Sequence, residues 1–234
     1  MRSIPMWRKT LTLALVLGCA CAFGQLNRRI EVGGGAGMMT YTGELARTYN
    51  LRTPRPALTV FYRRNLSPVV SLRTSLTFGS VKAEDNPFPI DPAALARDAS
   101  FQVSITEFSP VFEYHFLDWR TGKRPIRFTP YLFGGGGMFI FSGNKAKPVD
   151  YSNVQMCIPF GGGGKVVLTP YWYLAIEFGI RKTFFDHLDN ISDGDPAFKN
   201  YQYGNPYDKD NYFFTGITLT RTFYEIPCPS SPYR

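Results

Sequence analysis

Long stretches of the chain alternate apolar and polar residues with a period of two, and this pattern limits the fold more than any other feature. In YWYLAIEFGIRKTF (171–184), apolar side chains occupy the even positions from Trp172 to Phe184, interrupted only by Lys182. Residues 69–80, VVSLRTSLTFGS, repeat the alternation. A helix would space apolar residues three and four apart, whereas successive strand residues point to opposite faces. The pattern therefore predicts long β-strands with one apolar face.

The alternation divides the chain into eight predicted strands. They are expected at residues 28–39, 54–64, 68–81, 99–116, 127–141, 154–168, 171–185 and 211–225. The short connections NLSP, LDWRTGKRPI and TP alternate with long ones at 40–53, 82–98, 142–153 and 186–210. An even number of long strands, with turns that alternate between short and long, is typical of outer-membrane barrels. We therefore expect an all-β fold, an eight-stranded antiparallel transmembrane outer-membrane β-barrel.

Charged residues in the middle of the strands decide between this barrel and a soluble, lipocalin-like barrel with an apolar interior. The polar faces carry Arg73, Glu107, Glu113, Glu177 and Arg181. Inside a narrow barrel these side chains can pair, whereas in lipid each would cost several kcal/mol. We therefore expect a lumen charge network made of these five residues.

Aromatic residues support the membrane orientation, because many of them fall at strand ends, where interfacial girdles lie. They are Tyr62, Tyr114, Phe116, Tyr131, Tyr171, Trp172, Phe184, Phe185, Tyr212, Phe213, Phe223 and Tyr224. Two positions depart from the strand pattern. The phase of strand 99–116 changes between Ile105 and Phe108, which predicts a β-bulge near Glu107. Arg221 falls on the apolar face of the last strand, which is tolerable where it snorkels to an interface.

The first 24 residues have the features of a secretory signal. They combine a basic start, the apolar run LTLALVLGCACA and small residues before Gln25, and the run is too short to span a bilayer as a helix. Cleavage is expected before Gln25, which leaves the barrel at 25–226 and a Pro/Cys tail at 227–234. A lipobox at VLGC, with Cys19 acylated, is the alternative.

The mature chain then keeps two cysteines, Cys157 in a predicted strand and Cys228 in the tail PCPSSPYR. An even strand number places the N- and C-termini together in the periplasm, so Cys228 is expected to be a prominent periplasmic thiol. A bond to Cys157 would require the tail to reach the barrel wall. We therefore expect an intermolecular disulfide from Cys228 to a partner, with a free thiol as the alternative.

Glycine runs in FGGGGMFIF (133–141) and FGGGGKVVL (160–168) suggest at first a phosphate-binding loop. That loop requires G-x-x-x-x-G-K-[ST] at the start of a helix, but here Val166 follows Lys165 and the strand pattern continues. Glycines within strands instead allow sharp coiling, or leave room for large lumen side chains from a neighbouring strand.

Enzymatic chemistry has little support. A hydrolase needs a nucleophile, a base and an acid that converge, and neither His115, which is expected to face inward beside Glu113, nor His187, in the longest loop, has the spacing of a known triad. The aspartates near His187 lack the spacing of a calcium loop. We therefore expect no catalytic residue, no metal, no cofactor and no small-molecule substrate.

Other functional classes are also disfavoured. The formal charge is +8, but no dense Lys/Arg cluster is present, and export makes a nucleic-acid partner unexpected. No stretch after the signal reaches 18 apolar residues, so no transmembrane helix is expected. Eight strands enclose a lumen that side chains just fill, so a pore is not expected either. The barrel is therefore expected to act as a membrane anchor for another component.

Four segments carry a resemblance to a known family. They are EVGGGAGMMTYTGEL, TPYLFGGGGMFIFS, IPFGGGGKVVLTPYWYLAIEFGIRKTFFDHLDNIS and FFTGITLTRTFY. Together they cover most of the mature chain, and it resembles the PorG family, small outer-membrane barrels of the type IX secretion system in Bacteroidota. The resemblance implies a non-enzymatic component that ties a periplasmic ring of PorK-like lipoprotein and PorN-like protein to the outer membrane.

The partners expected from this resemblance are the ring proteins and outer-membrane lipid. On this hypothesis Cys228 bonds to the ring, and the turn at 117–126 together with the tail forms the docking surface. One alternative is an adhesin or envelope-stability barrel that acts through loop 186–210. Another is a lipid-modifying enzyme that depends on His187.

Overall fold

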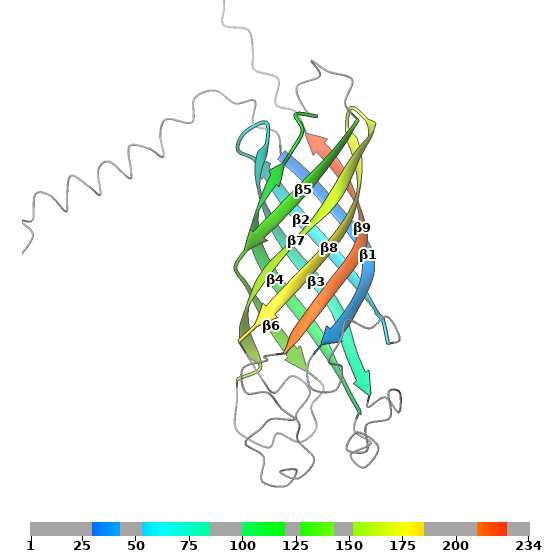
Figure 1. Cartoon of the computed structure of the whole chain (residues 1–234), viewed down its shortest axis with the longest axis vertical. Helices are drawn as coiled ribbons and strands as arrows, with labels where there is room; N and C mark the ends of the chain where they lie inside the picture. Colours follow the sequence, from blue (N-terminus) through cyan, green and yellow to red (C-terminus); the bar gives the residue numbers. More distant parts are fainter. Residues whose placement is uncertain are drawn as a thin grey trace, which may run out of the picture.

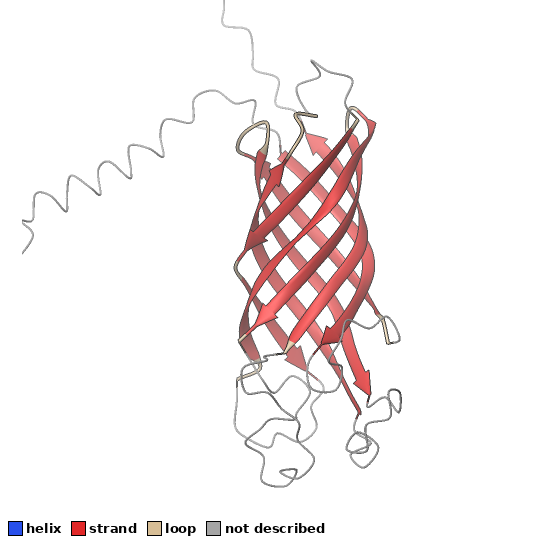
Figure 2. Cartoon of the chain, in the orientation of Figure 1, coloured by secondary structure: helices blue, strands red, loops and turns tan. Residues whose placement is uncertain are grey.

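A computed structural model describes residues 30–42, 53–84, 100–119, 127–142, 152–184 and 210–223. Several predictions fall outside these residues: the signal at 1–24, the tail at 227–234 with its Cys228, and His187. The described part of the chain is all β (Figures 1 and 2). Its strands are β1 (Ile30–Thr42), β2 (Arg55–Asn65), β3 (Val70–Glu84), β4 (Ser100–His115), β5 (Phe128–Gly135), β6 (Gly137–Ser142), β7 (Val154–Thr169), β8 (Trp172–Thr183) and β9 (Asn211–Phe223).

The strands form one antiparallel sheet that closes into a ring. Apart from β5 and β6, each strand pairs with its neighbour in sequence, and β1 pairs with the last strand, β9, along thirteen residues from Ile30↔Phe223 to Thr42↔Asn211. β5 and β6 both pair with β4 on one side and with β7 on the other, so together they occupy a single position in the wall. The predicted eight-stranded antiparallel barrel is confirmed.

The interruption between β5 and β6 coincides with prolines on both flanking strands. The register with β4 is unchanged from Val111↔Gly135 to Phe108↔Met138, which places Pro110 opposite Gly136. The register with β7 is likewise unchanged, which places Pro159 opposite Gly135. Because proline has no N–H, neither can donate to the carbonyl opposite, and the ladder is interrupted there.

The expected bulge near Glu107 is wrong. β3 and β4 stay in register without interruption from Val70↔Tyr114 to Glu84↔Ser100. The change of phase arises because Phe101, Val103 and Ile105 point into the lumen on the same face as Glu107, so the inward face itself changes from apolar to charged. The irregularity found instead lies at the end of β7, between Val167 and Thr169.

Two ends of the barrel can be distinguished by their connections. The short-turn end carries residues 66–69 and 170–171 and the connection from β4 to β5, and both Ile30 and Phe223 lie there (Figure 1). The long-loop end carries the other four connections, including the two longest, between β3 and β4 and between β8 and β9. Strand polarity therefore alternates around the ring, as an up-and-down barrel requires.

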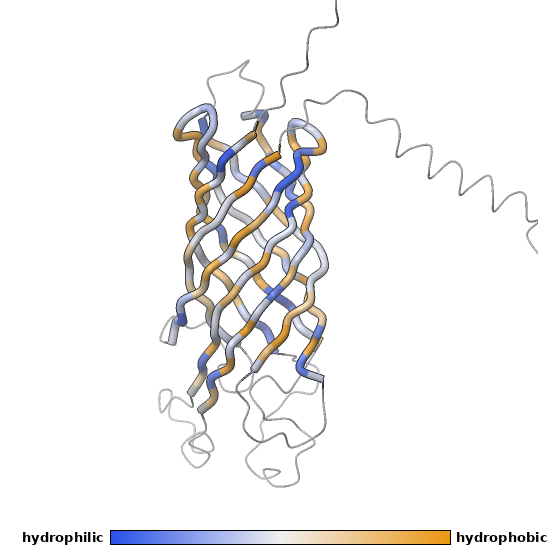
Figure 3. Tube along the Cα trace, turned by 180° about the vertical axis from the view of Figure 1, so that it is seen from behind, coloured by the Kyte–Doolittle hydropathy of each residue, from blue (hydrophilic) through white to orange (hydrophobic). Residues whose placement is uncertain are grey.

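The outward face of the wall is apolar along most of its length. Leu58, Val60, Phe112, Leu132 and Ile176 each expose more than half of their surface, and hydrophobic positions recur along the length of the strands (Figure 3). A closed antiparallel barrel with an apolar outer face and charged side chains inside is the outer-membrane type. The protein is therefore an outer-membrane barrel. In the part of the chain that the structure describes, no helix is long and apolar enough to cross a membrane.

The predicted aromatic positions divide into two groups. Most of those that the structure describes point outward, including Tyr62, Tyr171 and Trp172. Tyr131 and Tyr212, expected at the interface, instead lie in the lumen and are fully buried. Both occupy inward positions of their strands, and their hydroxyls bind lumen carboxylates.

Candidate functional site in the barrel lumen

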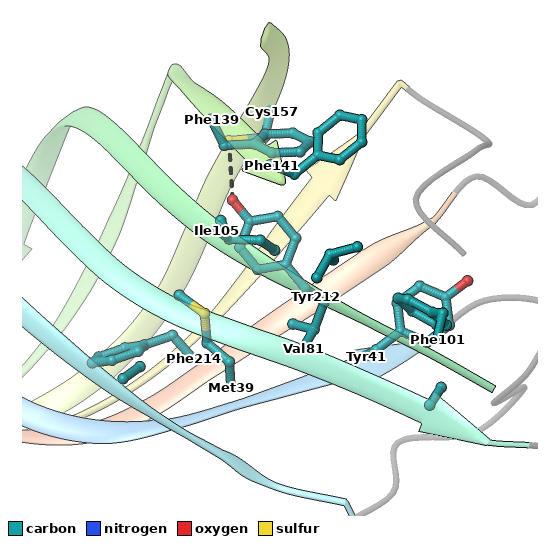
Figure 4. Close-up of a cluster of buried hydrophobic side chains, with 13 residues drawn as sticks. Met39, Tyr41, Val81, Phe101, Ile105, Phe139, Phe141, Cys157, Tyr212 and Phe214 are labelled. Atoms are coloured by element: carbon teal, nitrogen blue, oxygen red, sulfur yellow. Dashed lines mark hydrogen bonds between the residues drawn. The ribbon is translucent and has the colours of Figure 1, made fainter. Parts of the chain in front are cut away.

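Apolar side chains fill the lumen next to the long-loop end (Figure 4). This apolar layer consists of Met39, Tyr41, Ala57, Val81, Ala83, Phe101, Val103, Ile105, Phe139, Phe141, Cys157, Tyr212 and Phe214. The rings interlock edge to face, with centroids 4.9 Å apart for Tyr41–Phe101 and 5.5 Å for Phe139–Tyr212. The layer places a packed apolar plug between the long loops and the charged part of the lumen.

Glu113 is the centre of a buried ion network in the half of the lumen nearer the short turns. Its carboxylate lies 2.6 Å from Lys165 Nζ, 2.9 Å from Arg63 Nε and 3.2 Å from Arg73 Nε. All four side chains are at most 4 % exposed. Three cations on three other strands therefore converge on one carboxylate of β4, and they tie β2, β3 and β7 to β4 across the lumen.

Two further carboxylates complete this network. Arg63 donates to Glu31 at 2.7 Å, and the Asn65 amide donates to the same carboxylate at 2.6 Å. Arg73 forms an ion pair with Glu177 that includes an Nη2–Oε1 bond of 3.1 Å, and Glu177 also accepts from the Tyr131 hydroxyl at 3.0 Å. The contacts extend the network from β1 to β8, around most of the ring.

His115 and Trp119 lie at the short-turn mouth of the lumen. His115 Nε2 is 2.8 Å from Lys165 Nζ, and its Nδ1 is 3.2 Å from the carbonyl oxygen of Val69. Trp119 packs edge-on against Tyr173, with centroids 4.5 Å apart, and lies 5.8 Å from the His115 ring. Since Trp119 is 6 % exposed, the segment after β4 folds into the barrel mouth and covers the network.

A second, smaller network lies between the first one and the apolar layer. Glu107 accepts from Tyr212 at 2.8 Å, from Ser109 at 2.7 Å and from Arg181 Nε at 3.1 Å. The Tyr212 hydroxyl also lies 3.8 Å from the sulfur of Cys157, the contact drawn in Figure 4. The hydroxyl of Tyr212 thus joins this charged layer to the apolar one.

The charges that the described strand residues place in the lumen balance. Among the strand residues whose side chains the structure describes, the buried cations are Arg63, Arg73, Lys165 and Arg181, and the buried carboxylates are Glu31, Glu107, Glu113 and Glu177. Each of these eight has an ion-pair partner. A neutral set of fully paired charges fixes side chains in place, because breaking any pair leaves an uncompensated buried charge. The lumen is therefore built as a rigid filling.

Glycines make room for the large side chains of this filling. Tyr131 lies directly across from Gly163 in the β5–β7 ladder, and a methyl group on Gly163 would overlap the backbone oxygen of Ile176 on β8 and lie 2.8 Å from the tyrosine ring. Phe133 lies in the same way over Gly161, where the corresponding distance is 2.9 Å. The expectation that the glycines leave room for lumen side chains of a neighbouring strand is confirmed.

The five charged residues expected in the lumen all lie there, in two groups. Arg73, Glu113 and Glu177 belong to the larger network, and Glu107 and Arg181 form the smaller one. Three further lumen charges, Glu31, Arg63 and Lys165, are not among those predicted from the sequence. Arg63 could have been found, since it continues the inward phase of Thr59 and Phe61. Glu31 precedes and Lys165 follows a run of glycines, which carry no side chain to show the phase of the strand.

Two described residues with reactive side chains, His115 and Cys157, lie inside the lumen. His115 lies against Lys165, and Cys157 is buried in the apolar layer. Among the described side chains, no three of His, Cys, Asp and Glu are grouped to hold a metal ion.

Comparisons with known proteins give one family and several similar structures. A family model described as a domain of unknown function, DUF6089, matches residues 8–231. None of the curated proteins matches the chain. Among solved structures, a major outer membrane protein from Thermus thermophilus is similar, with a TM-score of 0.49 and 16 % identity over 85 % of this chain and 100 % of that one.

Two further solved structures are similar at the same level. Neisserial surface protein A has a TM-score of 0.48 and 9 % identity, over 83 % of this chain and 97 % of its own. Ail, the attachment invasion locus protein of Yersinia pestis, has a TM-score of 0.46 and 12 % identity, over 85 % of this chain and 100 % of its own.

Proposed function

The chain belongs to the DUF6089 family, and from its resemblance to the PorG family and its lumen geometry we propose that it is a non-enzymatic outer-membrane component of the type IX secretion system. In this role the barrel anchors a periplasmic ring of PorK-like and PorN-like proteins to the outer membrane. The proposal rests on the resemblance to the PorG family for the identity of the system and on the barrel structure for the mode of action.

The observation that carries the mode of action is the filled lumen. Balanced ion pairs occupy the half near the short turns, and the apolar layer occupies the half near the long loops. Such a lumen favours a holding role over conduction, because water and ions would have to displace paired charges and packed rings. A rigid barrel is a suitable membrane anchor for an assembly.

The short-turn end is the proposed periplasmic face. Trp119 packs into the barrel mouth, while Phe116 and Leu117 beside it remain exposed. This packing fixes the start of the turn at 117–126 to the barrel. The rest of that turn and the tail with Cys228 lie outside the described residues, and the proposal assigns them the contact with the ring.

The test is a non-reducing gel of purified outer membranes, blotted for this protein, with wild type beside Cys228→Ser. A heavy band that collapses on reduction and is missing from the variant is expected, and mass spectrometry of the band should identify a ring protein. Monomer bands in both lanes would remove the covalent link. Unchanged secretion and ring attachment in the variant would count against the docking role of the tail.

Deletions at the two ends separate this role from that of an adhesin or envelope-stability barrel. Removing residues 227–234 is expected to impair secretion and ring attachment. Removing loop 186–210 is expected to leave secretion intact. The opposite result would favour the alternative function, with the outer loops as the working surface. An altered membrane lipid in His187→Ala, with normal secretion, would instead indicate an enzyme.

A further inference from the structure

Charges are segregated between the two faces of the barrel wall. Every strand carboxylate whose side chain the structure describes points into the lumen. The outward face of the described strands carries instead four cations, Arg64, Lys82, Lys182 and Arg221. Because all of these carboxylates point inward, none of them can pair with the outward arginines Arg64 and Arg221.

Two of the outward cations lie close together at the short-turn end. Arg64 is opposite Ile30 in the β1–β2 ladder, and Arg221 is opposite Val32 in the β1–β9 ladder. Only β1 separates the two arginines, and they are offset by two residues along it. The outward surface between them is apolar, because Ile30, Val32 and Phe223 fill it.

Aromatic rings hold Arg221 at this rim. Its guanidinium carbon lies 5.2 Å from the centre of the Phe223 ring and 5.8 Å from that of Trp172, the residue opposite it on β8. Aromatic residues of membrane barrels lie at the level of the lipid headgroups. The two rings therefore place a positive charge at headgroup depth, beside an apolar surface that acyl chains can cover.

We propose that Arg64 and Arg221, with Trp172 and Phe223, form a binding site for an anionic phospholipid of the leaflet at the short-turn end. Guanidinium groups bind phosphate oxygens with two parallel hydrogen bonds, and the described strands present no outward carboxylate that would compete with this phosphate. The acyl chains would cover Ile30 and Val32. This lipid site is proposed independently of the secretion role, and the two proposals can be tested separately.

The experiment uses the full-length chain, folded in detergent and analysed by native mass spectrometry with phosphatidylglycerol or phosphatidylcholine added. Wild type is expected to retain phosphatidylglycerol preferentially. Arg221→Gln should reduce its apparent affinity about fivefold, and the double variant Arg64→Gln/Arg221→Gln should reduce it further. Arg221→Lys should retain part of the affinity, because it keeps the charge but loses the planar donor pair.

Lys182→Gln is the matched control, since Lys182 is an outward cation at the opposite end and makes no cation–ring contact with a described residue. A loss in this control as large as in Arg221→Gln would overturn the proposal, because it would show general attraction to any outward charge. Equal retention of the two lipids by wild type would overturn it as well. Competition by millimolar inorganic phosphate at constant ionic strength would assign the site to free phosphate rather than lipid. A gel-shift assay for folded barrel confirms that each variant is compared in the folded state.

Discussion

At the scale of single residues, Glu113 is the most connected group of the lumen. Three cations and His115 surround its carboxylate, and it is completely buried. The attraction inside a dry lumen is strong, but so is the cost of removing these charges from water, so the network as a whole adds little net stability. Removing any one member, however, leaves a buried charge without its partner and destabilises the barrel.

Glu113→Gln is therefore expected to lower the free energy of unfolding by about 3–5 kcal/mol, because it leaves four buried cations facing three carboxylates. Urea titration of the folded barrel in lipid vesicles, followed by tryptophan fluorescence, measures the change. Adding Lys165→Met restores the balance and should recover part of the loss. Thr222→Val is a matched control, because the buried Thr222 hydroxyl has no hydrogen-bond partner among the described residues, and it should not destabilise the barrel. A change below about 1 kcal/mol in Glu113→Gln would mean that water reaches the network.

Gly163→Ala tests the fit between glycines and lumen rings. The added methyl group would overlap the backbone carbonyl oxygen of Ile176 on β8 and lie 2.8 Å from the ring of Tyr131, whose hydroxyl binds Glu177. Both the β7–β8 backbone and the ring must therefore move. A loss of about 1–3 kcal/mol is expected in the same titration. Gly136→Ala is the control, because nothing lies within 4 Å of the added methyl group, and it should change stability by less than about 0.5 kcal/mol. Equal effects at both positions would show that backbone flexibility, not space, matters at Gly163.

At the scale of elements, the gap between β5 and β6 shows how proline can interrupt a strand that is otherwise in register. The backbone N–H of His115 donates to Val69, before β3, and the backbone N–H of Phe116 donates to Pro130 of β5. The backbone N–H groups of even-numbered residues in β4 therefore point toward β5 and β6. Pro110 would have to donate to Gly136, and by the same reasoning on β7 Pro159 would have to donate to Gly135. Two successive carbonyls of the wall therefore lack a ladder donor.

Pro110→Ala supplies the missing N–H opposite Gly136. We expect it to stabilise the barrel by about 1 kcal/mol, since an unpaired carbonyl in a membrane wall costs more than the entropy that proline removes from the unfolded chain. The urea midpoint measures the gain. Pro170→Ala, in the short turn between β7 and β8, is the control in which no ladder bond is gained. A lower midpoint in Pro110→Ala would contradict the assignment of the gap to the missing donor.

At the scale of the whole molecule, the barrel separates its charges by layer. The outer wall is apolar with cations near its rims, the lumen is charged near the short turns, and it is apolar near the long loops. Trp119 covers the charged part at one mouth, and the apolar layer covers it toward the other. These layers close the lumen from both sides.

The closed lumen predicts that the folded full-length chain gives no discrete current steps in a planar lipid bilayer at moderate voltage. Replacing Arg73 and Glu177 by serine and Phe139 and Phe214 by alanine removes parts of both layers, and this variant should show transient openings. Regular steps from wild type would contradict a filled lumen and would favour a transport role. The measurement is single-channel recording at matched protein density.

Several elements of this fold could be predicted from local patterns. The strand predicted at 154–168 is observed at Val154–Thr169, and the strand predicted at 211–225 is observed at Asn211–Phe223. Alternation identifies a strand and its faces because it depends only on successive residues of one segment. It failed at 99–116, where an apolar inward residue and an apolar outward one look the same in sequence, and so a bulge was expected in the continuous strand β4.

The sequence by itself determined the barrel, its strand positions, its apolar outer face and five of the inward charges, because all of these follow from a period of two and the cost of charge in lipid. Only the tertiary structure decided which charges meet. Arg73 and Glu177 are 104 positions apart, and they form an ion pair because closure of the ring places β3 and β8 across one lumen. The same closure brings Arg63, Glu31 and Lys165 into one network with Glu113 and stacks an apolar layer above it. Contacts across a lumen depend on strand number, tilt and register together, and no single segment of the chain encodes them.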